Sequence, residues 1–151
     1  MATLQHIPLS ETLIAPAISG PCRGLEITVL HTTTEGTLQA LKAAAELARG
    51  VGADIRLLVP QVVPFPLPLD EPQVSVEFAQ RRFRTVAADA GVDTRVDIRL
   101  CRDKEQMIRS ALPPHSVIVL GGRRGWWPTS EARLAKRLER LGHSVVFANL
   151  K

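Results

Sequence analysis

The sequence predicts an α/β fold, a three-layer α/β/α sandwich around a five-stranded, mostly parallel sheet. Five apolar runs rich in β-branched residues alternate with four segments of helical periodicity. The run at 116–122 is continuously apolar after Ser116, as expected for a strand covered on both faces. The length of 151 residues suits one compact domain with right-handed crossovers between its strands.

The first expected strand covers residues 25–32, and a helix follows a run of threonines. Thr32 with Glu35 resembles a capping box, and Thr34 is another possible N-cap. Apolar residues then recur at helical spacing up to Gly50, which is expected to end the helix in a left-handed conformation.

The second expected strand covers residues 53–63, where Pro60 weakens the pairing or marks the far end of the strand. The prolines of 64–72 exclude regular structure and predict a surface loop. An apolar stripe at helical spacing over 74–90 then predicts a second helix, which Gly91 closes.

The third expected strand, at 94–101, alternates apolar and charged residues. This period of two is typical of a strand buried on one side or lying at a sheet edge, and we place it at an edge. Asp103 is positioned to cap a short helix that the prolines at 113–114 stop, before the buried strand at 116–122.

The last expected helix begins at Ser130, a good N-cap, and ends at Gly142. Its basic residues are expected to face water. Its inward-facing residues are predicted to be Leu134, Leu138 and Leu141. An uncharged fifth strand at 144–150 closes the domain, and as an edge it exposes unpaired backbone groups that a homodimer would cover.

A glycine and arginine turn follows the buried strand at 116–122. Gly122 and Gly125 enclose Arg123 and Arg124, so backbone N–H groups and two guanidinium groups are able to converge beyond the carboxyl end of the strand. This arrangement predicts an anion site, although glycine-rich strand ends are also common without a ligand.

The charge of the chain indicates which classes of partner it favours. The net charge is +4, and from residue 102 to 151 ten Lys or Arg stand against four Asp or Glu. A basic face favours acidic partners such as nucleotides, nucleic acid or an acidic protein surface, while a solubilising surface charge is the plain alternative.

No apolar run approaches the length needed to cross a bilayer, and the first twenty residues lack a basic leader, so we expect a cytoplasmic protein without a membrane partner. Cys22 and Cys101 are expected to be reduced thiols, and the spacing of cysteines and histidines predicts no metal site. No catalytic residue is predicted, because the sequence has no nucleophile elbow or metalloprotease helix.

The order and spacing of residues 27–63, 103–112, 116–125 and 143–148 resemble the universal stress protein family, an adenine nucleotide alpha hydrolase-like fold. The resemblance covers about 25–148. It implies the strand order 3-2-1-4-5 and a homodimer that pairs along the last strand. Residues 1–23 are then an N-terminal extension, and 24–151 form the universal stress protein-like domain.

ATP-binding members of that family resemble one another in an Asp after strand one and in a G-x-x-G turn followed nine residues later by Gly and Ser or Thr. Here Thr32 takes the place of the Asp, and the turn from Gly122 to Gly125 matches the first half of the phosphate motif. Nine residues on lie Ala135 and Lys136, and an alignment with a shortened loop places Glu131 and Ala132 there. The ATP motif is therefore degenerate, and a glutamate in it would repel phosphate.

The crevice between strands one and four is the expected ligand site, because neighbouring strands with helices on opposite faces open a crevice there. Its candidate residues are His31, Thr32, Thr33, Gly121, Gly122, Arg123, Arg124, Gly125 and Ser130. His31 is also consistent with a structural role at a strand end.

Three functions follow from these features. The first is a non-catalytic, dimeric binding or regulatory module in stress response, without an obligatory cofactor. The alternative is a protein that binds ATP, another nucleotide or another phosphate ligand, with at most weak ATPase activity. The third, nucleic-acid binding, is unlikely, because Trp126 and Trp127 beside the arginines more often cover a crevice or pack at a subunit contact than stack on bases.

Overall fold

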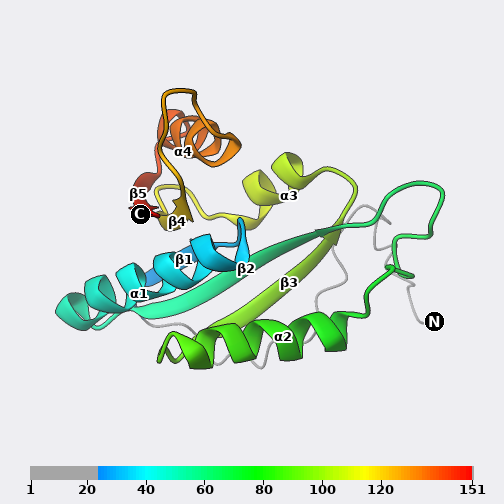
Figure 1. Cartoon of the computed structure of the whole chain (residues 1–151), viewed down its shortest axis with the longest axis horizontal. Helices are drawn as coiled ribbons and strands as arrows, with labels where there is room; N and C mark the ends of the chain where they lie inside the picture. Colours follow the sequence, from blue (N-terminus) through cyan, green and yellow to red (C-terminus); the bar gives the residue numbers. More distant parts are fainter. Residues whose placement is uncertain (1–23, 151) are drawn as a thin grey trace, which may run out of the picture.

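The computed structural model describes residues 24–150 and contains one five-stranded sheet in the order β3-β2-β1-β4-β5 (Figure 1). All four neighbouring pairs are parallel, so the predicted fold class and strand order are confirmed. The strands are β1 (Glu26–Leu30), β2 (Asp54–Val62), β3 (Arg95–Cys101), β4 (Val117–Gly122) and β5 (Ser144–Asn149).

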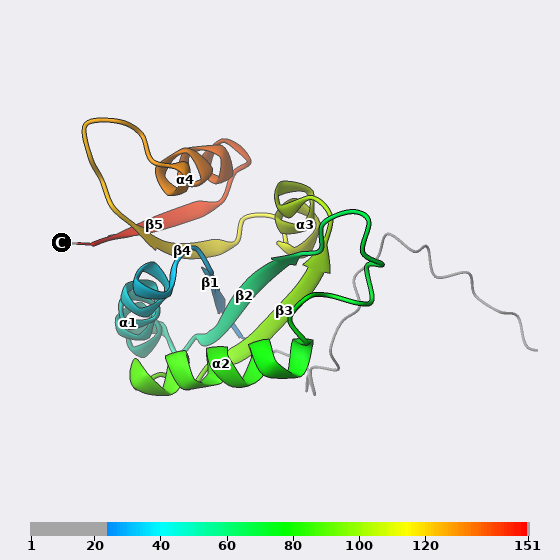
Figure 2. The ribbon, with the colours of Figure 1, turned by 45° about the vertical axis from the view of Figure 1, so that its right-hand side comes forward.

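Four helices cover the two faces of the sheet: α1 (Thr34–Val51), α2 (Val76–Asp89), α3 (Lys104–Ala111) and α4 (Ser130–Arg140). Figure 2 shows α1 and α2 below the sheet and α3 and α4 above it. The chain adds strands in one direction from β1 to β3 and in the other from β4 to β5, and right-handed crossovers then place the two helix pairs on opposite faces. Neighbouring strands β1 and β4 therefore have their following helices on different sides.

Each face has its own apolar core, because the central strands bury side chains in both directions. The core under α1 and α2 includes Val29, Leu41, Leu57, Phe83 and Ile98. The core under α3 and α4 includes Leu30, Leu58, Ile108, Ile118 and Leu138.

The ends of α1 differ from the prediction. Thr33 is the N-cap and accepts a hydrogen bond from the Gly36 N–H, whereas Thr32 and Thr34 were the expected caps. The Thr32 hydroxyl instead points to β4, where it donates to the Gly121 carbonyl. The helix continues past Gly50 and ends at Gly52, which has the left-handed φ of 64° that favours glycine.

The observed ends of α4 also differ from the predicted ends, by one residue at the N-cap. Thr129, rather than Ser130, is the N-cap and accepts from the Ala132 N–H, and Ser130 is the first helical residue. Leu141 is 49% exposed instead of facing inward, because the helix has already ended and the chain turns back at Gly142 with a φ of 95°. The predicted cap Asp103 is confirmed, since its carboxylate accepts from two N–H groups at the start of α3.

Strand β3 lies at the edge of the sheet, as its alternating pattern predicts. Asp97 on its polar face is nevertheless buried: it is only 9% exposed and accepts from Arg56 of β2 at 3.4 Å. The other terminal nitrogen of Arg56 donates to the Thr28 hydroxyl and the Ala111 carbonyl, both at 3.3 Å. A buried ionic cluster thus ties three strands to the end of α3.

The predicted N-terminal extension, residues 1–23, lies outside the described residues, as does Lys151. Within residues 24–150, no helix is long and apolar enough to span a membrane. Cys101 is a free, buried thiol.

Candidate functional site

The loop after β1 is joined directly to the end of β4, where the crevice was predicted. The Thr32 hydroxyl donates to the Gly121 carbonyl at 2.6 Å, across 89 residues of sequence. This bond uses the side chain that the sequence resemblance aligns with the family's adenosine-recognising Asp. The structure thus brings these two predicted site residues together, but they bond to each other and these two groups do not face an open ligand site.

The first turn of α1 also packs against β4 through glycine backbone. A Cβ atom on Gly121 would overlap the backbone of Gly36, and one on Gly36 would lie 2.6 Å from the Gly121 carbonyl oxygen. Because neither residue has a side chain, the helix and the strand approach at main-chain distance. Sequence reasoning missed Gly36, although a glycine inside a helix costs about 1 kcal/mol relative to alanine and is a signal of close packing.

His31 lies beside this contact and is held on two sides. Its Nδ1 atom is 2.7 Å from the Thr37 hydroxyl, and its ring packs edge-on against Phe83 with centroids 4.7 Å apart. Burial, together with the nearby positive charges of Lys104 and Arg82, lowers the pKa of His31 to about 4. The imidazole is therefore neutral at pH 7 and belongs to the packing of α1 and α2 on β1.

The two arginines of the turn contact different elements. Arg123 lies 3.9 Å from the carboxylate of Glu35 in the first turn of α1, and both side chains are largely exposed. Arg124 lies over the ring of Phe147 in β5, with its guanidinium carbon 5.0 Å from the ring centroid. The backbone N–H of Arg124 donates to the Asn149 side chain at 3.1 Å. The guanidinium groups thus contact opposite sides of the strand end.

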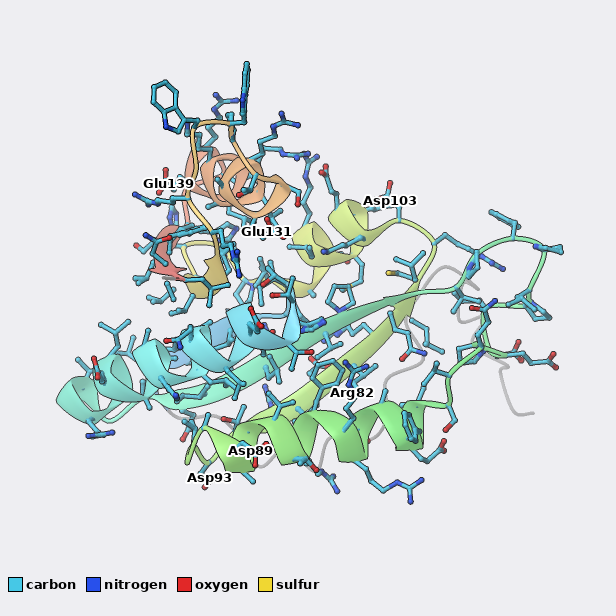
Figure 3. The ribbon with its side chains drawn as sticks, viewed as in Figure 1. Arg82, Asp89, Asp93, Asp103, Glu131 and Glu139 are labelled. Carbon is cyan, nitrogen blue, oxygen red and sulfur yellow. The ribbon has the colours of Figure 1, made fainter. Side chains whose placement is uncertain are left out.

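Glu131, in the first turn of α4 (Figure 3), packs against the strand end at Gly122. A Cβ atom on Gly122 would lie 2.9 Å from the Glu131 Cβ, so glycine is required there for the helix to come this close. In the alignment with a shortened loop, the sequence resemblance places this glutamate at the second half of the family's phosphate motif. A carboxylate at this point makes the site less favourable for a phosphate.

Thr129 takes the role that was predicted for Ser130. Its hydroxyl oxygen caps α4, and its O–H donates to the Arg123 carbonyl at 3.1 Å, which fixes the path of the loop between β4 and α4. Gly125, at the centre of this loop, has no atom near its Cβ position. The glycine therefore marks an open stretch of loop, unlike Gly121 and Gly122.

A cavity of about 380 Å³ lies on the α4 side of the same turn. It is bounded by the loop, by α4 and by β5, and Trp126 and Trp127 form part of its lining. Trp126 is fully exposed and Trp127 is 85% exposed, so neither indole packs into the switch-point crevice. Sequence reasoning did not predict this cavity, for which the small residues Ala132 and Ala135 on the inner side of α4 were the available signal.

Among residues 24–150, no group of three His, Cys, Asp or Glu side chains is arranged to hold a metal ion. His115 and His143 lie together at the opposite ends of β4 and β5 from the turn. Their rings bond to the backbone there: His115 to the Gly142 carbonyl at 3.1 Å, and His143 to the Ser116 N–H at 3.1 Å. They are part of the packing of the strand starts.

No protein-family model and no curated protein matches the chain. Among solved structures, it is similar to a universal stress protein from Archaeoglobus fulgidus, with a TM-score of 0.55 and 16% identity over 82% of this chain and 92% of that one. A universal stress protein from the same organism in complex with dAMP has a TM-score of 0.45 and 13% identity, over 82% of this chain and 96% of that one. The fold is therefore that of a universal stress protein, as the sequence resemblance predicts.

Proposed function

We propose that this protein is a non-catalytic binding or regulatory module of the universal stress protein type, which works in the cytoplasm as a homodimer and takes part in a stress response. Residues 24–151 form the module and residues 1–23 an extension to it. The observation that carries the proposal is the contact between Thr32 and Gly121, which fills the switch point with the chain's own atoms.

Nucleotide entry at the switch point would be costly. A base or ribose in that crevice would have to replace the 2.6 Å bond between Thr32 and Gly121 and separate α1 from β4 at Gly36. A buried carbonyl that loses its partner costs about 1–3 kcal/mol. Glu131 beside Gly122 adds charge repulsion to any phosphate that approaches the turn.

The outer edge of β5 supports the homodimer. Within the described residues β5 pairs with β4 alone, so its other edge presents unpaired N–H and C=O groups. The strand carries no charge that would discourage pairing, and Val146 is 37% exposed. Pairing with the same edge of a second copy satisfies the backbone groups and covers the valine.

Light scattering after size exclusion tests the dimer with a matched pair of variants. Val146→Lys places a charge on the edge strand, and Leu47→Lys places one on α1 at a similar exposure of 42%. We expect the wild type and Leu47→Lys to have twice the chain mass and Val146→Lys to have the single mass. A wild-type protein that stays monomeric at high concentration contradicts the dimer.

A second candidate function is binding of ATP or another phosphate ligand at the turn, with at most weak ATPase activity. Arg123 favours it, because its guanidinium is 73% exposed and only loosely paired with Glu35, close to the N–H groups that begin α1. A phosphate at this place would sit outside the closed switch point.

Calorimetric titration with ATP, AMP and cyclic AMP separates the two candidates, with the double variant Arg123→Ala/Arg124→Ala as the control. The proposed function predicts no saturable heat from a folded protein. Micromolar binding that the double variant loses would establish the phosphate site instead.

A further inference from the structure

The cavity beside α4 is not explained by the proposed function. It is lined by α4, β5 and the loop between β4 and α4, whereas the switch point lies on the α1 side of β4. Figure 1 and Figure 2 show this loop arching from β4 to α4. Its volume of about 380 Å³ falls within the range of about 300–1,000 Å³ that is usual for small-molecule sites.

The inner wall of the cavity is apolar. Ala132 and Ala135 line it from α4, and Val145 and Phe147 line it from β5. The alanines leave the space open, because longer side chains at these positions would fill it. Such a wall favours a hydrocarbon group, aromatic or aliphatic, since burial stabilises apolar surface by about 25 cal/mol per Å².

The charged lining has a net charge of +1. Arg124 and Lys136 contribute the two positive charges, and Glu139, labelled in Figure 3, contributes the negative one. Within residues 24–150 Arg124 has no ion pair, whereas its neighbour Arg123 pairs with Glu35. The guanidinium of Arg124 is held over Phe147, so a cation stands directly above the apolar wall.

We propose that this cavity binds a small amphipathic organic monoanion. Its hydrocarbon part packs on the alanines, Val145 and Phe147, and its carboxylate pairs with Arg124. A guanidinium suits this task because it forms two parallel hydrogen bonds to a carboxylate. Trp126 and Trp127 form the mouth of the site, where large aromatic side chains offer contact area to the ligand.

Three probes that share one skeleton test the proposal: phenylbutyrate, phenylbutanol and phenylbutylamine. Each is titrated into the full-length protein by calorimetry and by tryptophan fluorescence, which reports on this site because Trp126 and Trp127 are the two tryptophans of the chain. The variants are Arg124→Ala, the matched control Arg123→Ala, and Ala132→Leu to fill the cavity. Circular dichroism verifies that each variant is folded.

We expect saturable binding of phenylbutyrate that changes the fluorescence, and binding of the alcohol and the amine at least about tenfold weaker. Arg124→Ala should weaken phenylbutyrate binding at least about tenfold and Arg123→Ala less than about twofold, since a charge-assisted pair is lost in the first variant alone. A folded Ala132→Leu should lose the binding.

Three results would overturn the proposal: no saturable binding of phenylbutyrate, equal binding of the acid and the alcohol, or equal weakening by the two arginine variants. Calorimetry and fluorescence report ligand binding, and light scattering reports the chain mass, so failure of this proposal is distinguishable from failure of the proposed homodimer.

Discussion

The two sides of the β4 carboxyl end are built differently, although one short turn serves both. On the α1 side, Gly121 packs against Gly36 and bonds to Thr32, so the chain fills the place where this topology usually holds a ligand. On the α4 side, the loop and helix leave a cavity of about 380 Å³. Arg123 and Arg124, adjacent in sequence, belong to different sides. The strand order alone therefore does not determine where space for a ligand remains. Side-chain size at a few positions determines it.

The largest expected effect is a loss of stability when the packed contact between α1 and β4 is disrupted. Gly121→Ala places a methyl group into the backbone of Gly36 and forces α1 away from β4, which should lower the free energy of unfolding by about 3 kcal/mol. Gly125→Ala is the matched control, because nothing lies near that position and the change should stay within about 0.5 kcal/mol. Urea denaturation measures both, and equal stabilities would mean that the glycine contact is absent in solution.

The next effect is a pH dependence on the filled side. Burial lowers the pKa of His31 to about 4, below the unfolded value of 6.5, so the unfolded chain binds the proton more readily. The stability due to a neutral His31 is complete above pH 6.5 and falls as the pH drops towards 4. From about pH 7 to about pH 5 the loss should be about 2 kcal/mol.

The control for this pH dependence is His31→Asn, measured by urea denaturation at each pH. Titration of the remaining groups is common to both proteins, so the difference between their slopes isolates His31. Identical slopes would show that the imidazole is not buried against Phe83 and Thr37.

A smaller effect tests the bond across the switch point. Thr32→Val keeps the shape of the side chain but removes the donor to the Gly121 carbonyl, and it should cost about 1–2 kcal/mol. Thr32→Ser retains the hydroxyl and should recover most of that loss. If valine is as stable as threonine, the carbonyl has another partner and the switch point is less tightly closed than proposed.

Local sequence patterns predicted the framework, and close approaches between distant segments account for what they missed. Alternation and helical periodicity indicated every strand and helix, since each element is stabilised by burying one of its own faces. The N-caps at Thr33 and Thr129 were missed by one residue, because neighbouring hydroxyl residues are equivalent in sequence until tertiary contacts select one. The glycines were also equivalent in sequence, although Gly121 packs tightly against Gly36 and Gly125 has open space at its Cβ position.

The smallest expected effect is the change in stability when a larger side chain is placed in the cavity beside α4. Ala132→Leu adds three carbon atoms where the cavity has room, and leucine is as good in a helix as most residues, so the free energy of unfolding should change by less than about 1 kcal/mol. One added carbon at Gly121 is expected to cost several times more. The contrast between a large addition that is tolerated and a small one that is not would demonstrate in solution that one side of the strand end is packed and the other hollow. If Ala132→Leu destabilises the protein as much as Gly121→Ala does, the loop closes on α4 in solution and the cavity is not available to a ligand.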